Sequence, residues 1–176
     1  GTTGETYLFS TVDSAGVASL GGLAFDPVTQ QIFAVDRGTG IIHRFGLDGT
    51  EQGTYDHGIE GRPAAGLPPI PLSAFAPVDI GSAEFDSEDP GTWGLAPPAR
   101  RVFAVAVRNN RLYYSVAQGP QVWSVGIGAN GSLAATPRLE VESPALQDGV
   151  EITSIAFDGS GRMYVAERGA TLGDYE

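Results

Sequence analysis

A short phrase of two apolar runs occurs three times in this chain, and internal repetition of this kind limits the fold more than any other feature of the sequence. Each copy has an apolar run, a polar turn, a second apolar run, and then an often acidic residue followed by a loop with glycine. The copies cover residues 23–38, 105–119 and 155–169. Short apolar runs bounded by turn residues are typical of β-strands, so each copy predicts a β-hairpin. We therefore expect one β-sheet unit to be repeated along the chain.

The first copy belongs to a longer unit of four predicted strands. They cover residues 18–25, 32–36, 41–45 and 52–55. Asp48-Gly49 between the last two strands is a strong hairpin signal, because glycine tolerates the positive φ that such turns need. Four antiparallel strands in about 40 residues is the size of one propeller blade. The sequence thus predicts an all-β fold of the β-propeller class, and its 25 glycines and 12 prolines suit many short strands joined by tight turns.

The repeat divides the chain into four parts. Residues 1–55 hold an expected N-terminal strand over 6–12 and the first blade, and residues 56–100 form an insertion. Residues 101–142 form the second blade, and 143–176 begin a third. The later strands are predicted over 101–107, 112–116, 121–125, 138–141, 152–157 and 163–167. The third blade lacks its last two strands in this sequence. Propellers close with roughly four to eight blades, so we expect other segments of the same protein, or other chains, to complete the ring.

Residues 56–100 interrupt the repeat and contain eight of the 12 prolines. Proline removes backbone donors, so this part cannot be a central strand. We interpret it as a Pro-rich, acidic insertion that packs on the propeller through apolar anchors and offers a surface for protein contact. A plain capping loop is the alternative. The residues expected to make the contact are Pro68, Pro69, Phe75, Phe85 and Trp93.

Composition excludes several classes of function. The net charge of −11 disfavours nucleic acid and anionic lipid as partners. The absence of cysteine excludes disulfides, thiolate zinc sites and cysteine nucleophiles. No apolar run approaches the roughly 18 residues of a membrane span. Very low lysine content with one methionine and no cysteine favours an exported protein, periplasmic, cell-surface or secreted.

The repeated phrase resembles the NHL repeat and the related regucalcin-like gluconolactonase family. Leu23-Ala24-Phe25-Asp26-Pro27 followed by Ile32 to Phe45 carries the resemblance, and Ile155 to Gly169 is similar. It implies a six-bladed propeller, of which this chain would supply a part. In such blades we expect small residues such as Gly21 and Gly22 on the inner strands, and large apolar residues such as Phe25 and Tyr164 between neighbouring sheets. In the lactonase-like proteins a Glu, an Asn and an Asp at the channel mouth hold a divalent cation that polarises the lactone carbonyl. That full set has no match here.

Two groups of carboxylates are candidate cation ligands, for Ca²⁺ or another divalent ion. Asp36 and Glu167 follow the second strand of their copies, and a structural role in the adjacent loop is the alternative for both. Asp86, Glu88 and Asp89 cluster in the insertion and offer hard oxygen ligands, although they lack EF-hand spacing. A solvated acidic loop is the alternative there.

Catalytic motifs are absent from the sequence. His43 lies within a predicted strand, and His57 follows Asp56 at the start of the insertion, where an Asp-His pair could shuttle protons. There is no nucleophile elbow, no His-Glu-x-x-His and no phosphate-binding glycine loop. The sequence therefore favours a non-enzymatic binding or scaffolding module in a larger exported protein or assembly. The alternatives are a metal-dependent lactonase-like hydrolase with its other ligands on blades outside this sequence, and a structural subunit of a surface filament or complex.

Overall fold

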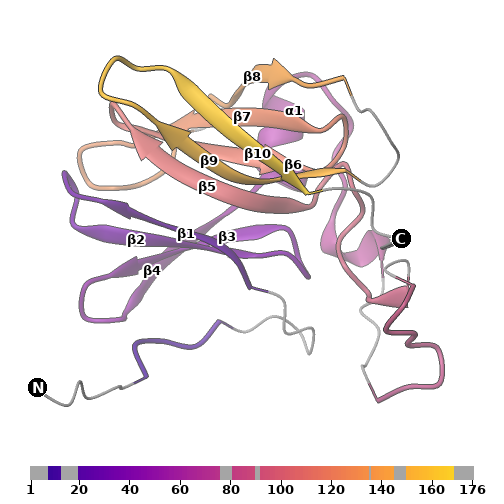
Figure 1. Ribbon diagram of the computed structural model, residues 1–176. Coiled ribbons are helices and arrows are strands. Elements are labelled where there is room, and N and C mark those ends of the chain that lie inside the picture. The colour runs from indigo at the N-terminus through magenta and orange to yellow at the C-terminus, as the bar shows by residue number, and fades with distance from the viewer. Residues whose placement is uncertain are drawn as a thin grey trace, which may run out of the picture.

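The computed structural model describes residues 8–12, 20–75, 81–89, 92–134, 136–144 and 150–168. These residues form three antiparallel sheets (Figure 1). Two sheets have four strands in the orders β1-β2-β3-β4 and β5-β6-β7-β8, and the third pairs β9 with β10. The all-β class predicted from the repeat is confirmed.

The strand ends agree closely with the sequence predictions wherever both are described. The first sheet contains β1 (Leu20–Asp26), β2 (Gln31–Asp36), β3 (Ile41–Gly46) and β4 (Glu51–Asp56). The second contains β5 (Val102–Arg108), β6 (Arg111–Val116), β7 (Gln121–Gly126) and β8 (Arg138–Glu142). The third contains β9 (Glu151–Phe157) and β10 (Met163–Arg168).

The turns between the strands contain glycine and asparagine residues with positive φ. Gly49 in the β3–β4 turn has φ of 80°, and Asn109 and Asn110 in the β5–β6 turn have φ of 49° and 56°. Positive φ at both central residues is the backbone of a hairpin turn whose twist matches its strands. Gly131, after β7, has φ of 78°. The local chemistry of the turns thus sets where the strands end.

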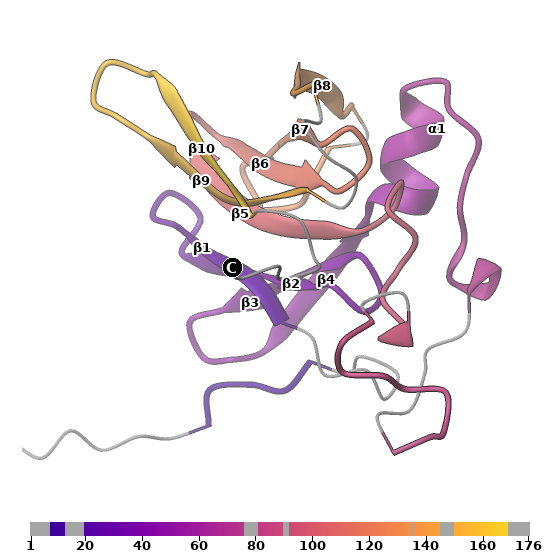
Figure 2. The same cartoon turned by 45° about the vertical axis from the view of Figure 1, so that its right-hand side comes forward.

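The sheets follow one another through their first strands. β5 contacts β1 on one side and β9 on the other. A Cβ on Gly21 of β1 would lie 2.7 Å from the carbonyl oxygen of Phe103 in β5, and one on Gly22 would lie 3.1 Å from it. The two backbones can therefore approach this closely only because β1 carries glycine there. This accounts for the small residues expected on the inner strands, and it gives the propeller-like succession of sheets seen in Figures 1 and 2.

Two apolar cores lie between the sheets. The first joins the first and second sheets, and the second joins the second and third. The first includes Phe33, Val35, Ile42 and Tyr55 opposite Leu112, Tyr114, Val116 and Trp123. The second is built from Ala104, Val122, Ile152 and Ile155. Each sheet of the succession is therefore fixed to the next by buried apolar side chains.

Three sequence expectations differ from the structure. Residues 8–12 of the predicted N-terminal strand form no strand; Phe9 instead packs edge-on against Phe45, with ring centroids 6.4 Å apart. Thr6 and Tyr7 lie outside the described residues. Phe25 and Tyr164, expected between sheets, are exposed. Side chains alternate across a strand, and the neighbours Ala24 and Met163 take the positions that face the cores.

The described residues between β4 and β5 form no strand, as their prolines predict. A π-helical turn at His57–Gly61 leads into the short helix α1 (Arg62–Ala64), and a 3₁₀ turn covers Leu72–Ala74. Figure 2 shows α1 and the turn before it beside the second sheet, where the His57 ring lies 4.9 Å from that of Trp123. No helix within the described ranges is long and apolar enough to cross a membrane.

Candidate functional site

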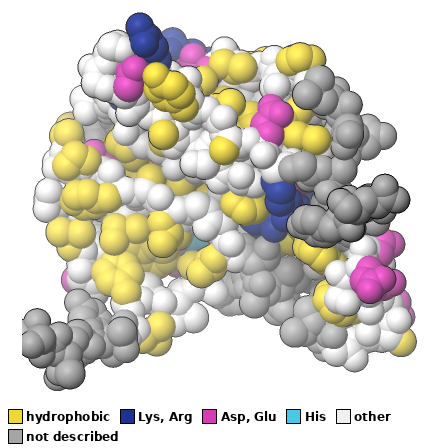
Figure 3. Space-filling model, viewed as in Figure 1, with side chains coloured by type: hydrophobic (Ala, Val, Ile, Leu, Met, Phe, Trp, Pro, Cys, Tyr) yellow, Lys and Arg dark blue, Asp and Glu magenta, His cyan; other side chains and the backbone are white. Residues whose placement is uncertain are grey.

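The outer face of the first sheet carries exposed apolar side chains. Leu23 and Phe25 of β1 are 68% and 49% exposed, and Leu20 is also exposed. Across β2, Leu23 is paired with Ala34 and Phe25 with Ile32, so these side chains share one face of the sheet. The opposite face is buried against the second sheet. Figure 3 shows hydrophobic side chains gathered over this part of the molecule. A large exposed apolar patch marks a surface for contact with another protein element.

The third sheet has a comparable exposed surface. In the part of the chain that the structure describes, β10 pairs only with β9. Tyr164 and Val165 of β10 are exposed. A strand edge with unpaired backbone groups is a template for further pairing.

A cluster of charged side chains lies where the inner strands begin. Glu151, the first residue of β9, accepts a hydrogen bond from Arg37 (2.7 Å). Its second oxygen lies 3.2 Å from Arg101 Nε, and Arg168 lies 3.9 Å from the oxygen that Arg37 contacts. Arg37 follows β2, Arg101 precedes β5 and Arg168 ends β10, so all three sheets contribute. We call these four residues the arginine cluster.

Burial shapes the electrostatics of the arginine cluster. It lowers the pKa of Arg37 and of Arg101 from the usual arginine value, because a desolvated guanidinium is less stable when charged. Glu151 opposes this effect on both pKa values, and the neighbouring arginines add to it. The Arg37 guanidinium also lies over the Phe103 ring, 4.4 Å from its centroid.

The carboxylates proposed as cation ligands hold local structure. Asp36 is buried and accepts hydrogen bonds from Gly38 N (2.9 Å) and Thr39 Oγ1 (2.6 Å), and burial raises its pKa. Glu167 is exposed and accepts one from Ser143 Oγ at 2.9 Å. Among the described residues, no three or more His, Cys, Asp or Glu side chains gather where they could hold a metal ion.

The acidic group of the insertion is an exposed loop. Asp86 Oδ1 accepts a hydrogen bond from Glu88 N at 2.9 Å, and Glu88 and Asp89 are exposed. Trp93 Nε1 donates to the carbonyl of Asp86 at 3.0 Å and closes the loop. A calcium ion at this loop stays a prediction.

The expected protein-contact residues divide into two groups. Pro68 and Pro69 are exposed. Phe75, Phe85 and Trp93 are half-buried. The structure places these residues on the segment between β4 and β5, and their part in a contact stays a prediction.

The two histidines have separate structural surroundings. His43 Nδ1 lies 2.8 Å from Glu51 across β3 and β4. His57 is buried, and its Nδ1 lies 3.0 Å from the Tyr114 hydroxyl. Burial, followed by the charges of Arg62 and Arg100, lowers the pKa of His57 to about 3. His57 is therefore neutral at pH 7 and lies in the core.

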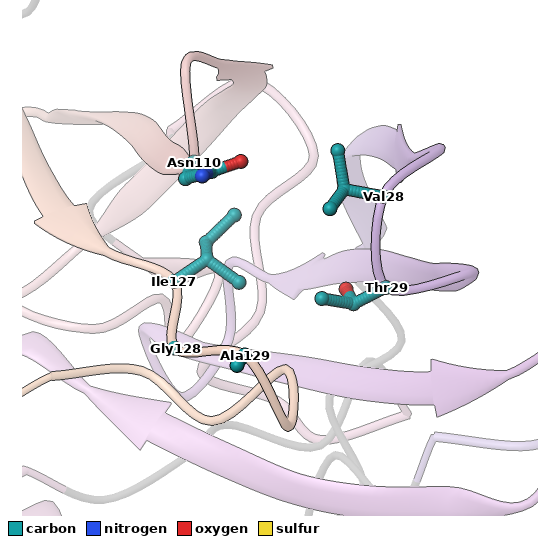
Figure 4. A pocket seen from close by; sticks show the side chains of 6 residues that line it. All are labelled: Val28, Thr29, Asn110, Ile127, Gly128 and Ala129. Atoms are coloured by element: carbon teal, nitrogen blue, oxygen red, sulfur yellow. The ribbon is translucent and has the colours of Figure 1, made fainter.

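An open cavity of about 260 Å³ lies at the opposite end of the sheets from the arginine cluster (Figure 4). It is bounded by the β1–β2 turn of the first sheet and by turns of the second. Its lining consists of Val28, Thr29, Asn110, Ile127, Gly128 and Ala129. No charged side chain lines the cavity, so it has few groups that could take part in catalysis or in recognition of a charged ligand.

Sequence reasoning missed the arginines that matter most to this structure. Arg100 is fully buried, Arg37 is nearly so, and Arg101 is partly buried. The available signal was the Arg100-Arg101 pair directly before an inner strand, together with arginine at the same position in the first and third copies.

Comparisons with known proteins give only distant similarities. No family model matches the chain, and no curated protein does. A PQQ-bound aldose sugar dehydrogenase from Streptomyces coelicolor is similar in structure, with 15% identity and a TM-score of 0.40. The match covers 80% of this chain and 34% of that one, so the chain spans about a third of its length. The computationally designed Ika4 protein is similar at 13% identity with a TM-score of 0.31, covering 94% of this chain and all of that one. At these TM-scores and identities, neither similarity assigns a family or a function.

Proposed function

We propose that this chain contributes consecutive blades of an NHL-like β-propeller and acts as a binding or scaffolding module in an exported protein. Other segments of the same protein, or other chains, would complete the ring. The observation that carries the proposal is the outer face of the first sheet, with Leu20, Leu23 and Phe25 exposed. The very low lysine content, the single methionine and the absence of cysteine support export.

The two interfaces between successive sheets show how a third one would form. Each interface between successive sheets buries apolar side chains from both partners. The outer face of the first sheet has the same kind of side chains, and Phe9 packs on one part of it. Each apolar side chain buried there would contribute about 1.5–3 kcal/mol. Covering this face with another four-stranded sheet is therefore favourable for the same reason as the two existing interfaces.

The exposed edge of β10 supports the same proposal from the other end. Two more strands would extend the third sheet to the four that the first and second sheets have. The metal-dependent hydrolase alternative has no specific observation in its favour among the described residues.

The test is a double substitution, Leu23→Gln with Phe25→Gln. If other chains cover the face, the double variant should dissociate at a higher protein concentration than the wild type, as measured by sedimentation velocity. If the same polypeptide covers it, the urea midpoint should fall instead. The matched control is Val28→Gln with Leu47→Gln, which replaces two exposed apolar residues in the turns of the same sheet. Equal behaviour of the two double variants in both measurements would contradict the proposal.

A further inference from the structure

The arginine cluster brings three cations to a single anion. In the described part of the chain, Glu151 is the carboxylate that pairs with Arg37, Arg101 and Arg168. Three positive charges and one negative charge leave a local excess of two positive charges. The whole chain has a net charge of −11, so the arginine cluster is a locally positive site on a protein that is negative overall.

Two of the three arginines occupy equivalent positions of the sequence repeat. Arg37 and Arg168 follow the second strand at the same position of the first and third copies, where the second copy has Gln118. Because the sheets succeed one another through their first strands, these equivalent positions converge at one end of the structure. Figure 3 shows basic side chains gathered near the end of β10.

Two buried donors of the cluster have no hydrogen-bond partner. A guanidinium has five N–H donors. The Nε atoms of Arg37 and Arg101 are buried and have no hydrogen-bond partner. Arg101 Nε lies 3.2 Å from Glu151, close enough for an ion pair but poorly aligned for a hydrogen bond. Buried polar groups are rarely left unpaired, and an unpaired one is a reason to look for a missing partner.

We propose that Arg37, Arg101 and Arg168 bind a small oxyanion, either a phosphate group or a carboxylate of a small organic acid. The planar fork of an arginine matches the two oxygens of either group. The Arg168 side chain is 40% exposed and that of Arg101 is 17% exposed, whereas Arg37 and Glu151 lie deeper. The anion therefore enters beside Arg168 and Arg101, with Arg37 behind it.

An anion would relieve the unfavourable electrostatics of the cluster. The lowered pKa values of Arg37 and Arg101 arise from burial and in part from repulsion between the arginines. A second negative charge beside Glu151 opposes both effects. This inference does not depend on the proposed scaffolding function, because it rests on the charges of the arginine cluster and not on the exposed apolar face of the first sheet.

The experiment titrates the purified protein with sodium phosphate and, separately, with sodium succinate. Sodium chloride at equal ionic strength is the reference, and the thermal midpoint is the measurement. A ligand that binds the folded state raises the midpoint in a saturable way. We expect this for at least one of the two anions, and the one that acts identifies the source of the oxyanion. Equal midpoints in all three salts would overturn the proposal.

Two variants locate the site. Arg168→Gln should weaken binding about tenfold, because it removes one charge-assisted contact at the rim. Arg162→Gln is the matched control, since Arg162 is an exposed arginine on the turn at the other end of β9 and β10. Equal binding by the two variants would overturn the proposal.

Glu151→Gln separates a binding site from a purely structural salt bridge. Removing the carboxylate raises the local excess to three positive charges, so the variant should lose stability in chloride and bind the anion several-fold more tightly than the wild type. The anion should then restore much of the lost stability. Weaker anion binding by this variant than by the wild type would contradict the proposal.

Discussion

Arg100 and Asp56 form a buried ion pair that joins a residue just before β5 to the end of β4. The guanidinium Nη2 lies 2.6 Å from Asp56 Oδ2, and the Arg100 side chain is completely buried. Arg100 also donates hydrogen bonds to the carbonyl oxygens of Thr39 and Ile70, each at 2.6 Å. One side chain thus connects the first sheet, the segment after β4 and the start of the second sheet.

Replacing Arg100 with methionine should strongly destabilise the fold. Arg100→Met keeps much of the side-chain volume but leaves Asp56 and two carbonyl groups without their partner. Breaking a buried ion pair in this way costs about 3–5 kcal/mol. Urea unfolding at pH 7 measures the loss directly.

The control for Arg100 is an exposed ion pair. Arg138 lies 2.6 Å from Glu140, and its side chain is 61% exposed. Arg138→Met should change the free energy of unfolding by less than about 1 kcal/mol, since surface pairs contribute little. A comparable effect of the two substitutions would show that the Arg100 network is not a special support of the fold.

Ser115 connects the second and third sheets through backbone groups. Its buried hydroxyl accepts a hydrogen bond from Ala104 N at 2.8 Å and donates one to the carbonyl oxygen of Ile152 at 2.7 Å. Ser115→Ala leaves both groups unsatisfied, so the free energy of unfolding should fall by about 1–3 kcal/mol. Amide hydrogen exchange at Ala104 should also become faster. Ser160→Ala, at an exposed turn serine, is the control and should leave both measurements nearly unchanged.

Gly21 sets the distance between the first two sheets. Gly21→Ala would place a methyl group 2.7 Å from the carbonyl oxygen of Phe103. Neither backbone can move without disturbing the core between the sheets, so we expect a loss of about 1–3 kcal/mol in unfolding free energy. A methyl group on Gly159 would meet no other atom within 4 Å, and Gly159→Ala should be neutral within about 0.5 kcal/mol. An equally neutral Gly21→Ala would mean that the sheets do not depend on this close approach.

Apart from the N-terminal strand, the sequence was sufficient to predict the strands, because the ends of the strands depend on local chemistry. Asp48-Gly49 and Asn109-Asn110 specify hairpin turns on their own, and the repeat confirmed each strand by a second copy. Which face of a strand is buried depends on what lies beside it. Phe25 was therefore misplaced, although the position of its strand was correct.

The arginines escaped prediction for a related reason. Arg37 and Glu151 are 114 residues apart in sequence, and Arg100 and Asp56 are 44 apart. No local pattern distinguishes a buried arginine from an exposed one, because burial depends on a partner supplied by another sheet. For Asp36 the residues alone left two interpretations open, a cation ligand and a structural role in the adjacent loop. Its hydrogen bonds to Gly38 and Thr39 provide that structural role.

The buried His57 should make stability depend on pH. Its pKa is about 3 in the folded protein, because of burial and then the charges of Arg62 and Arg100, against about 6.5 in an unfolded chain. Between these values the unfolded state binds the extra proton. Stability therefore rises with pH through this window, is complete above the unfolded value, and is lost as the pH falls towards 3.

His57→Gln isolates this contribution. The variant should be less stable than the wild type at pH 7, since glutamine does not reproduce the ring contacts with Tyr114 and Trp123. As the pH falls below about 6, the wild type should lose up to about 1.4 kcal/mol per pH unit more than the variant, because only the wild type has this proton to bind. Urea unfolding at about one-unit intervals from neutral pH to about pH 4 measures the two curves. Because carboxylate titrations are common to both proteins, they cancel in the difference, and parallel curves would mean that His57 is protonated as readily in the folded protein as in the unfolded chain.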